Sequence, residues 1–171
     1  MNDDLDDLLD RLETASSVRS LRSALESFAG RTGFDHFAYV HLRGPVAEVF
    51  TDYPREWRDR YFEHRYDAVD PVILAARRSL RIERWSGDAA HFRRGSPQWR
   101  FFRDAAAYGL HSGISVPIRV GFGGTAVLAF ASARREIDVR SIEAARAHTA
   151  VAFLHLKLAE FGGGHPAAYG L

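Results

Sequence analysis

Apolar residues recur every three to four positions in several parts of the chain, and this spacing predicts amphipathic helices. The first helical region spans residues 3–30, and the polar stretch TASS at 14–17 predicts a break followed by a new N-cap. Later helices are expected where proline or a capping Asp or Ser precedes an apolar pattern. These starts are Pro54, Asp70–Pro71 (through Ala76), Ser96–Pro97 (through Tyr108) and Asp138.

Alternating apolar and polar residues, often β-branched or aromatic, predict strands between these helices. The expected strands are residues 37–42, 47–53, 79–85, 114–120 and 125–132. Pro117 cannot donate a backbone hydrogen bond, so it predicts an edge position or a bulge. The order of elements predicts an α+β fold, an α/β/α sandwich in which an antiparallel sheet of about five strands lies between helical layers.

One domain is expected over residues 1–160, and the Gly- and Pro-rich residues 161–171 predict a flexible linker or tail. The last helix carries apolar residues on two faces, which is more than one sheet contact requires and indicates contact with another subunit.

Composition removes several classes of function. The 23 basic and 22 acidic residues give a net charge of +1, which provides no broad attraction to nucleic acid or to an anionic membrane. The chain has no cysteine, so disulfides and thiolate sites are excluded. Its N-terminus is acidic where a signal peptide would be basic, and no apolar run is long enough to cross a membrane. We therefore expect a cytoplasmic protein that does not enter a membrane.

Motifs for catalysis are absent from the sequence. There is no phosphate loop, no GxSxG, no HExxH and no GxGxxG before a helix, and GFGG at 121–124 is typical of a hairpin turn. The eight histidines are scattered without the spacing of metal ligands. The sequence therefore predicts a protein that is not an enzyme and that has neither a cofactor nor a metal site.

The stretch TDYPREWRDRYFEHRYDAVDP at 51–71 allows two interpretations. In the first, Tyr53, Trp57 and Tyr61 are core aromatics and Asp70 is only a helix N-cap. In the second, these side chains form one wall of a pocket. An indole can donate a hydrogen bond, a carboxylate can accept one, and a phenol can do either. That set matches a small ligand with two carbonyls and one amide N–H, and the local pattern leaves both interpretations open.

The segments FAYVHL, YFxxxYxxxDPV, WSG and SGISVPI follow one another along the chain. They are accompanied by an ordered series of single residues: Tyr53, Trp57, Tyr61, Asp70–Pro71, Trp85, Ser86, Gly87, Gly113 and Pro117. This series, over roughly residues 5–160, resembles the autoinducer-binding domain of LuxR-family quorum-sensing regulators, in particular the TraR-type members.

The resemblance implies a PAS/GAF-like sandwich that encloses an N-acyl-homoserine lactone between the sheet and one helical layer. It implies that Trp57 donates to the lactone carbonyl, Asp70 accepts the amide N–H and Tyr53 donates to the acyl carbonyl. Tyr61 and Trp85 would form walls around the head group. The acyl chain would lie among Ala38, Val40, Val49, Phe62, Val72, Ile73, Phe101, Ala105, Leu110 and Val127.

One position departs from the family pattern. Ala129 stands where TraR-type relatives that recognise a 3-oxo group have a hydroxyl residue, which indicates an unsubstituted chain unless Ser115 or Thr125 supplies the hydroxyl.

Full-length members of this family read DNA through a helix-turn-helix domain, which is absent from these 171 residues. We expect a homodimer, or a heterodimer with a full-length relative, and DNA contact only through that further domain. A natural short form would make a dimer with one DNA-reading half and would block binding to a two-fold operator. The remaining alternative is a PAS- or GAF-like sensor of another small molecule.

Overall fold

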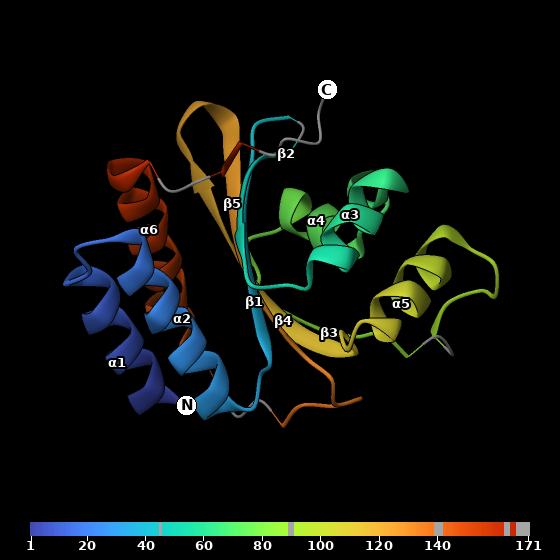
Figure 1. Cartoon of the computed structure of the whole chain (residues 1–171), viewed down its shortest axis with the longest axis horizontal. Coiled ribbons are helices and arrows are strands. Elements are labelled where there is room, and N and C mark those ends of the chain that lie inside the picture. The colour runs from blue at the N-terminus through green and yellow to red at the C-terminus, as the bar shows by residue number, and fades with distance from the viewer. Residues whose placement is uncertain (45, 89–90, 139–141, 163–164, 167–171) are drawn as a thin grey trace.

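The computed structural model describes residues 1–44, 46–88, 91–138, 142–162 and 165–166. Its described part is a single antiparallel sheet between two helical layers (Figure 1), which confirms the predicted α+β sandwich. The strands are ordered β3-β4-β5-β1-β2-β6. Their bounds are β1 (His36–Leu42), β2 (Val46–Thr51), β3 (Glu83–Ser86), β4 (Ser112–Val120), β5 (Gly124–Ser132) and the two-residue β6 (His165–Pro166).

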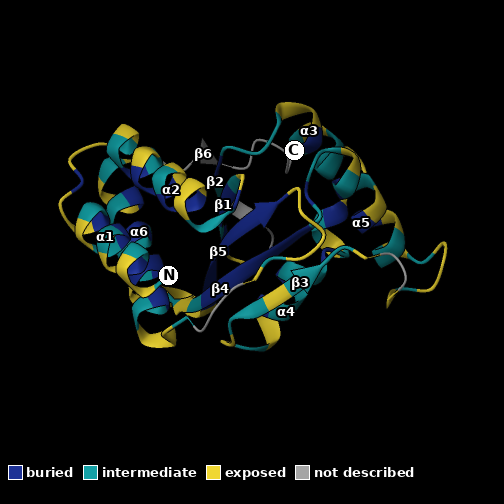
Figure 2. Cartoon of the chain, turned by 90° about the horizontal axis from the view of Figure 1, so that it is seen from below, coloured by how far each residue is buried: buried dark blue, intermediate teal, exposed yellow. Residues whose placement is uncertain are grey.

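One helical layer consists of α1 (Asn2–Glu13), α2 (Val18–Thr32) and α6 (Ala144–Phe161). Its contact with the sheet forms the main hydrophobic core, to which Leu8, Leu12, Leu25, Phe37 and Leu154 contribute. The other layer contains α3 (Arg55–Glu63), α4 (Pro71–Arg78) and α5 (Pro97–Ala107), with a 3₁₀ turn, η1 (Tyr66–Ala68), between α3 and α4. Figure 2 shows the buried strands between these two layers.

Local sequence signals explain where most helices begin. The predicted break at TASS separates α1 from α2, and the Ser17 and Ser20 side chains form a capping box at the start of α2. The Asp70 side chain accepts from the Val72 backbone N–H at the start of α4, and Ser96 accepts from Trp99 N–H at the start of α5. The sequence predicted Pro54 as the first helical residue of α3, but Pro54 is the N-cap and the helix begins one position later, at Arg55.

Two predicted boundaries were wrong by four residues or more. Helix α6 begins at Ala144 rather than Asp138, because Glu143 has an extended backbone (φ −70°, ψ 110°). Ile142 precedes the helix and packs against the main core, so its apolar character reflects that contact and not a helical face. Residues 139–141 lie outside the described residues.

Strand β3 is also shorter than expected, Glu83–Ser86 instead of 79–85. It pairs with β4 only as far as Ser115, two residues before Pro117. Beyond that point proline has no N–H to donate to a neighbouring strand. Among the described strands, β4 is therefore an edge at Pro117, as the sequence predicted.

The sequence predicted a flexible tail over residues 161–171. Phe161 is the last residue of α6, and residues 165–166 pair with β2 next to Val49 and Glu48. The remaining tail positions, 163–164 and 167–171, lie outside the described residues.

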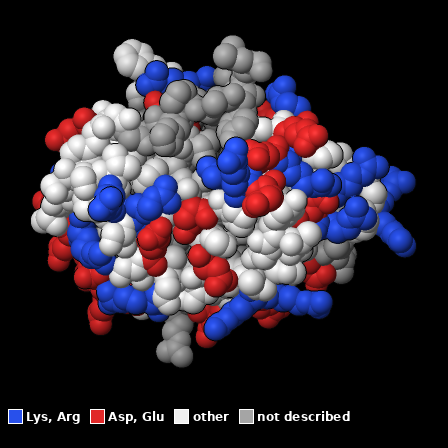
Figure 3. Space-filling model, viewed as in Figure 1, with Lys and Arg blue, Asp and Glu red and all other residues white. Residues whose placement is uncertain are grey.

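Acidic and basic side chains are interspersed over the face of the molecule shown in Figure 3, as the near-zero net charge leads one to expect. Within the ranges that the structure describes, no helix is long and apolar enough to cross a membrane. The same residues contain no group of three or more His, Asp or Glu side chains that could hold a metal ion.

Candidate functional site

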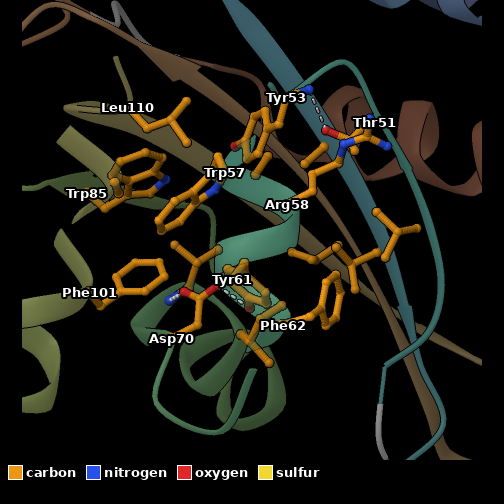
Figure 4. A pocket seen from close by; sticks show the side chains of 18 of the residues that line it. Thr51, Tyr53, Trp57, Arg58, Tyr61, Phe62, Asp70, Trp85, Phe101 and Leu110 are labelled. Carbon is orange, nitrogen blue, oxygen red and sulfur yellow. Dashed lines mark hydrogen bonds between the residues drawn. The ribbon is translucent and has the colours of Figure 1, made fainter. Parts of the chain in front are cut away.

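A cavity of about 90 Å³ lies between the sheet and the layer formed by α3, α4 and α5. Strand periodicity provides its floor: Ala38 and Val40 of β1 face the cavity, whereas Phe37 and Tyr39 face the main core. The neighbouring strands add Val49 and Val127 to the same face. The full lining is Ala38, Val40, Val49, Thr51, Tyr53, Trp57, Arg58, Tyr61, Phe62, Asp70, Val72, Ile73, Trp85, Phe101, Phe102, Ala105, Leu110, Val127 and Ala129 (Figure 4).

Helix α3 brings aromatic side chains to this cavity. Trp57 and Tyr61 lie one turn apart on the same helix face, with ring centroids 5.8 Å apart at 75°. Tyr53 precedes the helix, and its backbone N–H donates to the Thr51 hydroxyl at 3.0 Å. The Thr51 hydroxyl donates in turn to the Phe37 carbonyl at 2.7 Å, which anchors the turn to β1 and so positions Tyr53 at the cavity wall.

Asp70 is the carboxylate of the cavity and is only 7% exposed. One carboxylate oxygen accepts from Val72 N–H at 2.9 Å, and the other accepts from the Tyr61 hydroxyl at 2.7 Å (Figure 4). Burial raises the pKa of Asp70 to about 6, because it outweighs the opposing effect of these hydrogen bonds. A carboxylate has about four acceptor positions, so the bonds from Tyr61 and from the backbone N–H groups of Val72 and Ile73 leave room for another donor. Asp70 is thus both a helix cap and an acceptor in the cavity.

The phenols beside Asp70 remain neutral at physiological pH. Burial raises the pKa of Tyr53 and of Tyr61, and the charge of Asp70 raises both further. A neutral phenol keeps its proton and can donate a hydrogen bond. Tyr61 uses that proton on Asp70, which orients the carboxylate.

Trp85 of β3 is part of the cavity wall, and its position depends on Gly113. The two residues are cross-strand partners in the pairing of β3 with β4. A Cβ atom at position 113 would lie 2.6 Å from Trp85 Cε2 and closer still to the Phe130 carbonyl oxygen, so only glycine leaves room for the indole. Trp85 Nε1 is buried and has no hydrogen-bond partner among the described residues.

Outside the cavity, a polar cluster ties α3 to α5. Arg60 Nε donates to Asp104 Oδ2 at 3.0 Å, and the Tyr66 hydroxyl donates to the same oxygen. Partial burial acts to raise the pKa of Asp104, but the hydrogen bonds from Tyr66 and Arg60 outweigh it and lower the pKa. Asp70 and Asp104 are therefore shifted in opposite directions.

The cavity brings together every residue that the sequence analysis assigned to the site except Ser115. Ser115 is buried on β4 beside Ala129 but lies outside the cavity wall. Thr125, the other hydroxyl considered, is also outside the wall, and its oxygen accepts from Arg119 at 2.6 Å. Neither hydroxyl is therefore part of the cavity wall beside Ala129.

Three lining residues were missed from the sequence: Thr51, Arg58 and Phe102. The alternation of β2 could have indicated Thr51, since it lies two positions after Val49. No local signal distinguishes Arg58 from the other arginines of α3. Its Nε is buried without a hydrogen-bond partner in the described part of the chain.

Residues 17–158 match the sequence family described as the autoinducer binding domain. The transcriptional activator TraR of Agrobacterium vitis is 33% identical over 155 residues, which cover 88% of this chain and 66% of that protein. The quorum-sensing regulator RhlR of Pseudomonas aeruginosa is 31% identical over 138 residues, 78% of this chain and 55% of that protein. The chain thus spans between half and two thirds of the length of these relatives, which are named as transcriptional regulators.

Solved structures share the fold. Escherichia coli SdiA superposes with a TM-score of 0.76 at 21% identity, covering 92% of this chain and 67% of that one. CepR2 of Burkholderia cenocepacia, described as an N-acylhomoserine lactone dependent LuxR-family factor, has a TM-score of 0.68 at 24% identity and covers 94% of both chains. With the family match and the TraR identity, these similarities show that the chain belongs to the autoinducer-binding domains of LuxR-type quorum-sensing regulators.

Proposed function

We propose that this domain binds an N-acyl-homoserine lactone in the cavity beneath α3, α4 and α5. One observation supports this most directly: a buried carboxylate, Asp70, lies among aromatic donors in a cavity that is otherwise almost entirely apolar. A ligand amide N–H would occupy the free acceptor capacity of Asp70. A few convergent polar groups in an apolar pocket are typical of small-molecule sites.

In this proposal each polar side chain binds a different group of the ligand head. Trp57 donates to the lactone carbonyl, Tyr53 donates to the acyl carbonyl, and Asp70 accepts the amide N–H while Tyr61 holds its carboxylate in place. The acyl chain lies over the sheet floor, against apolar side chains contributed by β1, β2, β5 and α4: Val40, Val49, Val127 and Ile73. SdiA has been solved with octanoyl-rac-glycerol, so in that protein a ligand of the fold carries an acyl chain.

Binding would stabilise the native state by mass action, by about 4 kcal/mol at a thousandfold excess of ligand over its Kd. The ligand would thus act on the regulator by stabilising its native state. In a full-length regulator, the ligand would raise the fraction of folded, DNA-binding protein.

We also propose that the domain self-associates through the outer face of α6. Leu156 is 64% exposed on that face, and Ala145 and Thr149 are exposed on the turns before it. The second apolar stripe of the helix, which includes Val151 and Leu158, is buried in the main core. The exposed stripe suits a second copy of the chain.

The test is a titration of the purified domain with acyl-homoserine lactones of increasing chain length, followed by calorimetry and thermal unfolding. We expect saturable binding and a rise in Tm with at least one chain length. 1-Octanoylglycerol is the control, because it has an acyl chain but no amide N–H for Asp70. If the control stabilises the domain and no lactone does, the proposal is wrong and the domain senses another small molecule.

A further inference from the structure

The indole N–H of Trp85 is a buried donor without an acceptor among the described residues. An indole nitrogen can only donate, and a buried donor left unpaired is unfavourable because its desolvation is not compensated by a hydrogen bond. Such groups are rare in native proteins and usually have a specific reason. The head-group roles described above use Trp57, Tyr53 and Asp70 and leave this N–H unassigned.

The ring cannot turn to find a partner elsewhere. Its Cε2 atom, which is bonded to Nε1, lies against Gly113, where a Cβ atom would be only 2.6 Å away. The ring also stacks on Phe102, with ring centroids 6.2 Å apart at 30°. The strand beneath and the aromatic ring beside it therefore fix the direction of the N–H.

That direction is toward the cavity. Trp85 is part of the cavity wall, and Figure 4 shows its nitrogen on the side of the ring that faces Trp57. Two indoles thus approach the same end of the cavity from different elements, Trp85 from β3 and Trp57 from α3. Asp70 lies near the same end, so the head group of the ligand is the part that both indoles can reach.

We propose that Trp85 is a specificity-determining donor, whose Nε1–H binds the second lone pair of the lactone carbonyl oxygen beside Trp57. This inference rests on the proposed function, since it concerns the same ligand. A carbonyl oxygen has two lone pairs, so it can accept from two indoles at once. Two neutral donors converging on one oxygen select a ring that carries a carbonyl at this position over a ring that carries none.

Three ligands with the same acyl chain isolate this contact: the homoserine lactone, the 2-aminocyclopentanone amide, which keeps the ring carbonyl, and the cyclopentylamine amide, which lacks it. All three keep the amide that Asp70 and Tyr53 bind. The Kd of each is measured by calorimetry for wild type and for Trp85→Phe, which retains an aromatic ring over Gly113 but has no N–H. We expect the variant to bind the lactone and the cyclopentanone about three- to tenfold more weakly and the cyclopentylamide unchanged.

Trp99→Phe is the matched control. Trp99 lies on α5, stacks with Arg103 at 4.8 Å and is not part of the cavity wall, so this variant should bind all three ligands as wild type does. If Trp85→Phe lost the same affinity for all three ligands, Trp85 would act only as an apolar part of the wall and the proposed hydrogen bond would be refuted. Unchanged affinity for all three would show that its N–H touches no ligand.

A measurement on wild-type protein keeps the proposal testable if Trp85→Phe fails to fold. The chain has three tryptophans and therefore three indole N–H resonances. The Trp85 resonance is assigned through its proximity to Gly113. It should move downfield with the lactone and the cyclopentanone but not with the cyclopentylamide, and the absence of that difference refutes the contact. If wild type binds none of the three ligands, the proposed function itself fails.

Discussion

Replacing Asp70 by asparagine should weaken ligand binding while leaving the fold intact. The asparagine carbonyl can still accept from Val72 N–H, and asparagine and aspartate are about equally good N-caps. The new amide NH₂ takes the place of the oxygen that Tyr61 now contacts at 2.7 Å, and it presents a donor to the ligand N–H. A hydrogen bond to a charged group contributes about 1.5–3 kcal/mol, so the Kd should rise roughly 10- to 100-fold.

At neutral pH the same substitution should not lower the stability of the ligand-free domain, although it weakens ligand binding. Because burial raises the pKa of Asp70 to about 6, the native state binds this proton more tightly than the unfolded state does. Wild-type stability therefore falls, through this group, as pH rises from about 4 to about 6, by about 2–3 kcal/mol in all. The asparagine side chain of the variant does not titrate. The stability of the variant relative to wild type should rise over the same interval, and at pH 7 the variant should be at least as stable.

Two measurements check this reasoning: calorimetric Kd values for an acyl-homoserine lactone and for its ester analogue, in which oxygen replaces the amide N–H, and urea unfolding at pH 4.5 and pH 7.5. Asp104→Asn is the control, since the lowered pKa of Asp104 predicts a loss of stability at neutral pH without selectivity between amide and ester. Wild-type affinity for the lactone in Asp70→Asn, or an equal loss for amide and ester, would refute the assignment.

Other predictions concern stability and assembly. Gly113→Ala should destabilise the domain by about 3 kcal/mol, because the new Cβ would overlap the Phe130 carbonyl and Trp85, and an unchanged urea midpoint would contradict this. Arg58→Met should stabilise the ligand-free domain by about 1 kcal/mol, since it removes a buried, unpartnered Nε but keeps an apolar stem, and a lower midpoint would argue against it. Leu156→Lys should abolish self-association in sedimentation experiments with a stability change below about 0.5 kcal/mol, and an unaltered dimer population would exclude this face of α6.

Local patterns allowed much of the fold to be predicted. The capping residues Ser17, Asp70 and Ser96 fixed the starts of three helices because a cap acts on backbone groups two or three residues away. The alternation in β1 placed Ala38 and Val40 on one face, since successive strand side chains point to opposite sides. This signal, like a cap, acts over only a few residues of the chain. Where a boundary depended on a distant partner, as with β3 and Pro117 or with Ile142 before α6, the local pattern placed it wrongly.

The family, the order of the elements and nearly all residues of the cavity wall could therefore be inferred from the sequence. The chemical behaviour of those residues depends on contacts that form only in the folded chain. The pKa of Asp70 rises because the folded chain buries its carboxylate, and the Trp85 N–H has no partner among the described residues while Gly113 and Phe102 hold its ring. Caps and periodicity are short-range properties of a chain, whereas burial depends on segments that meet only when the chain has folded.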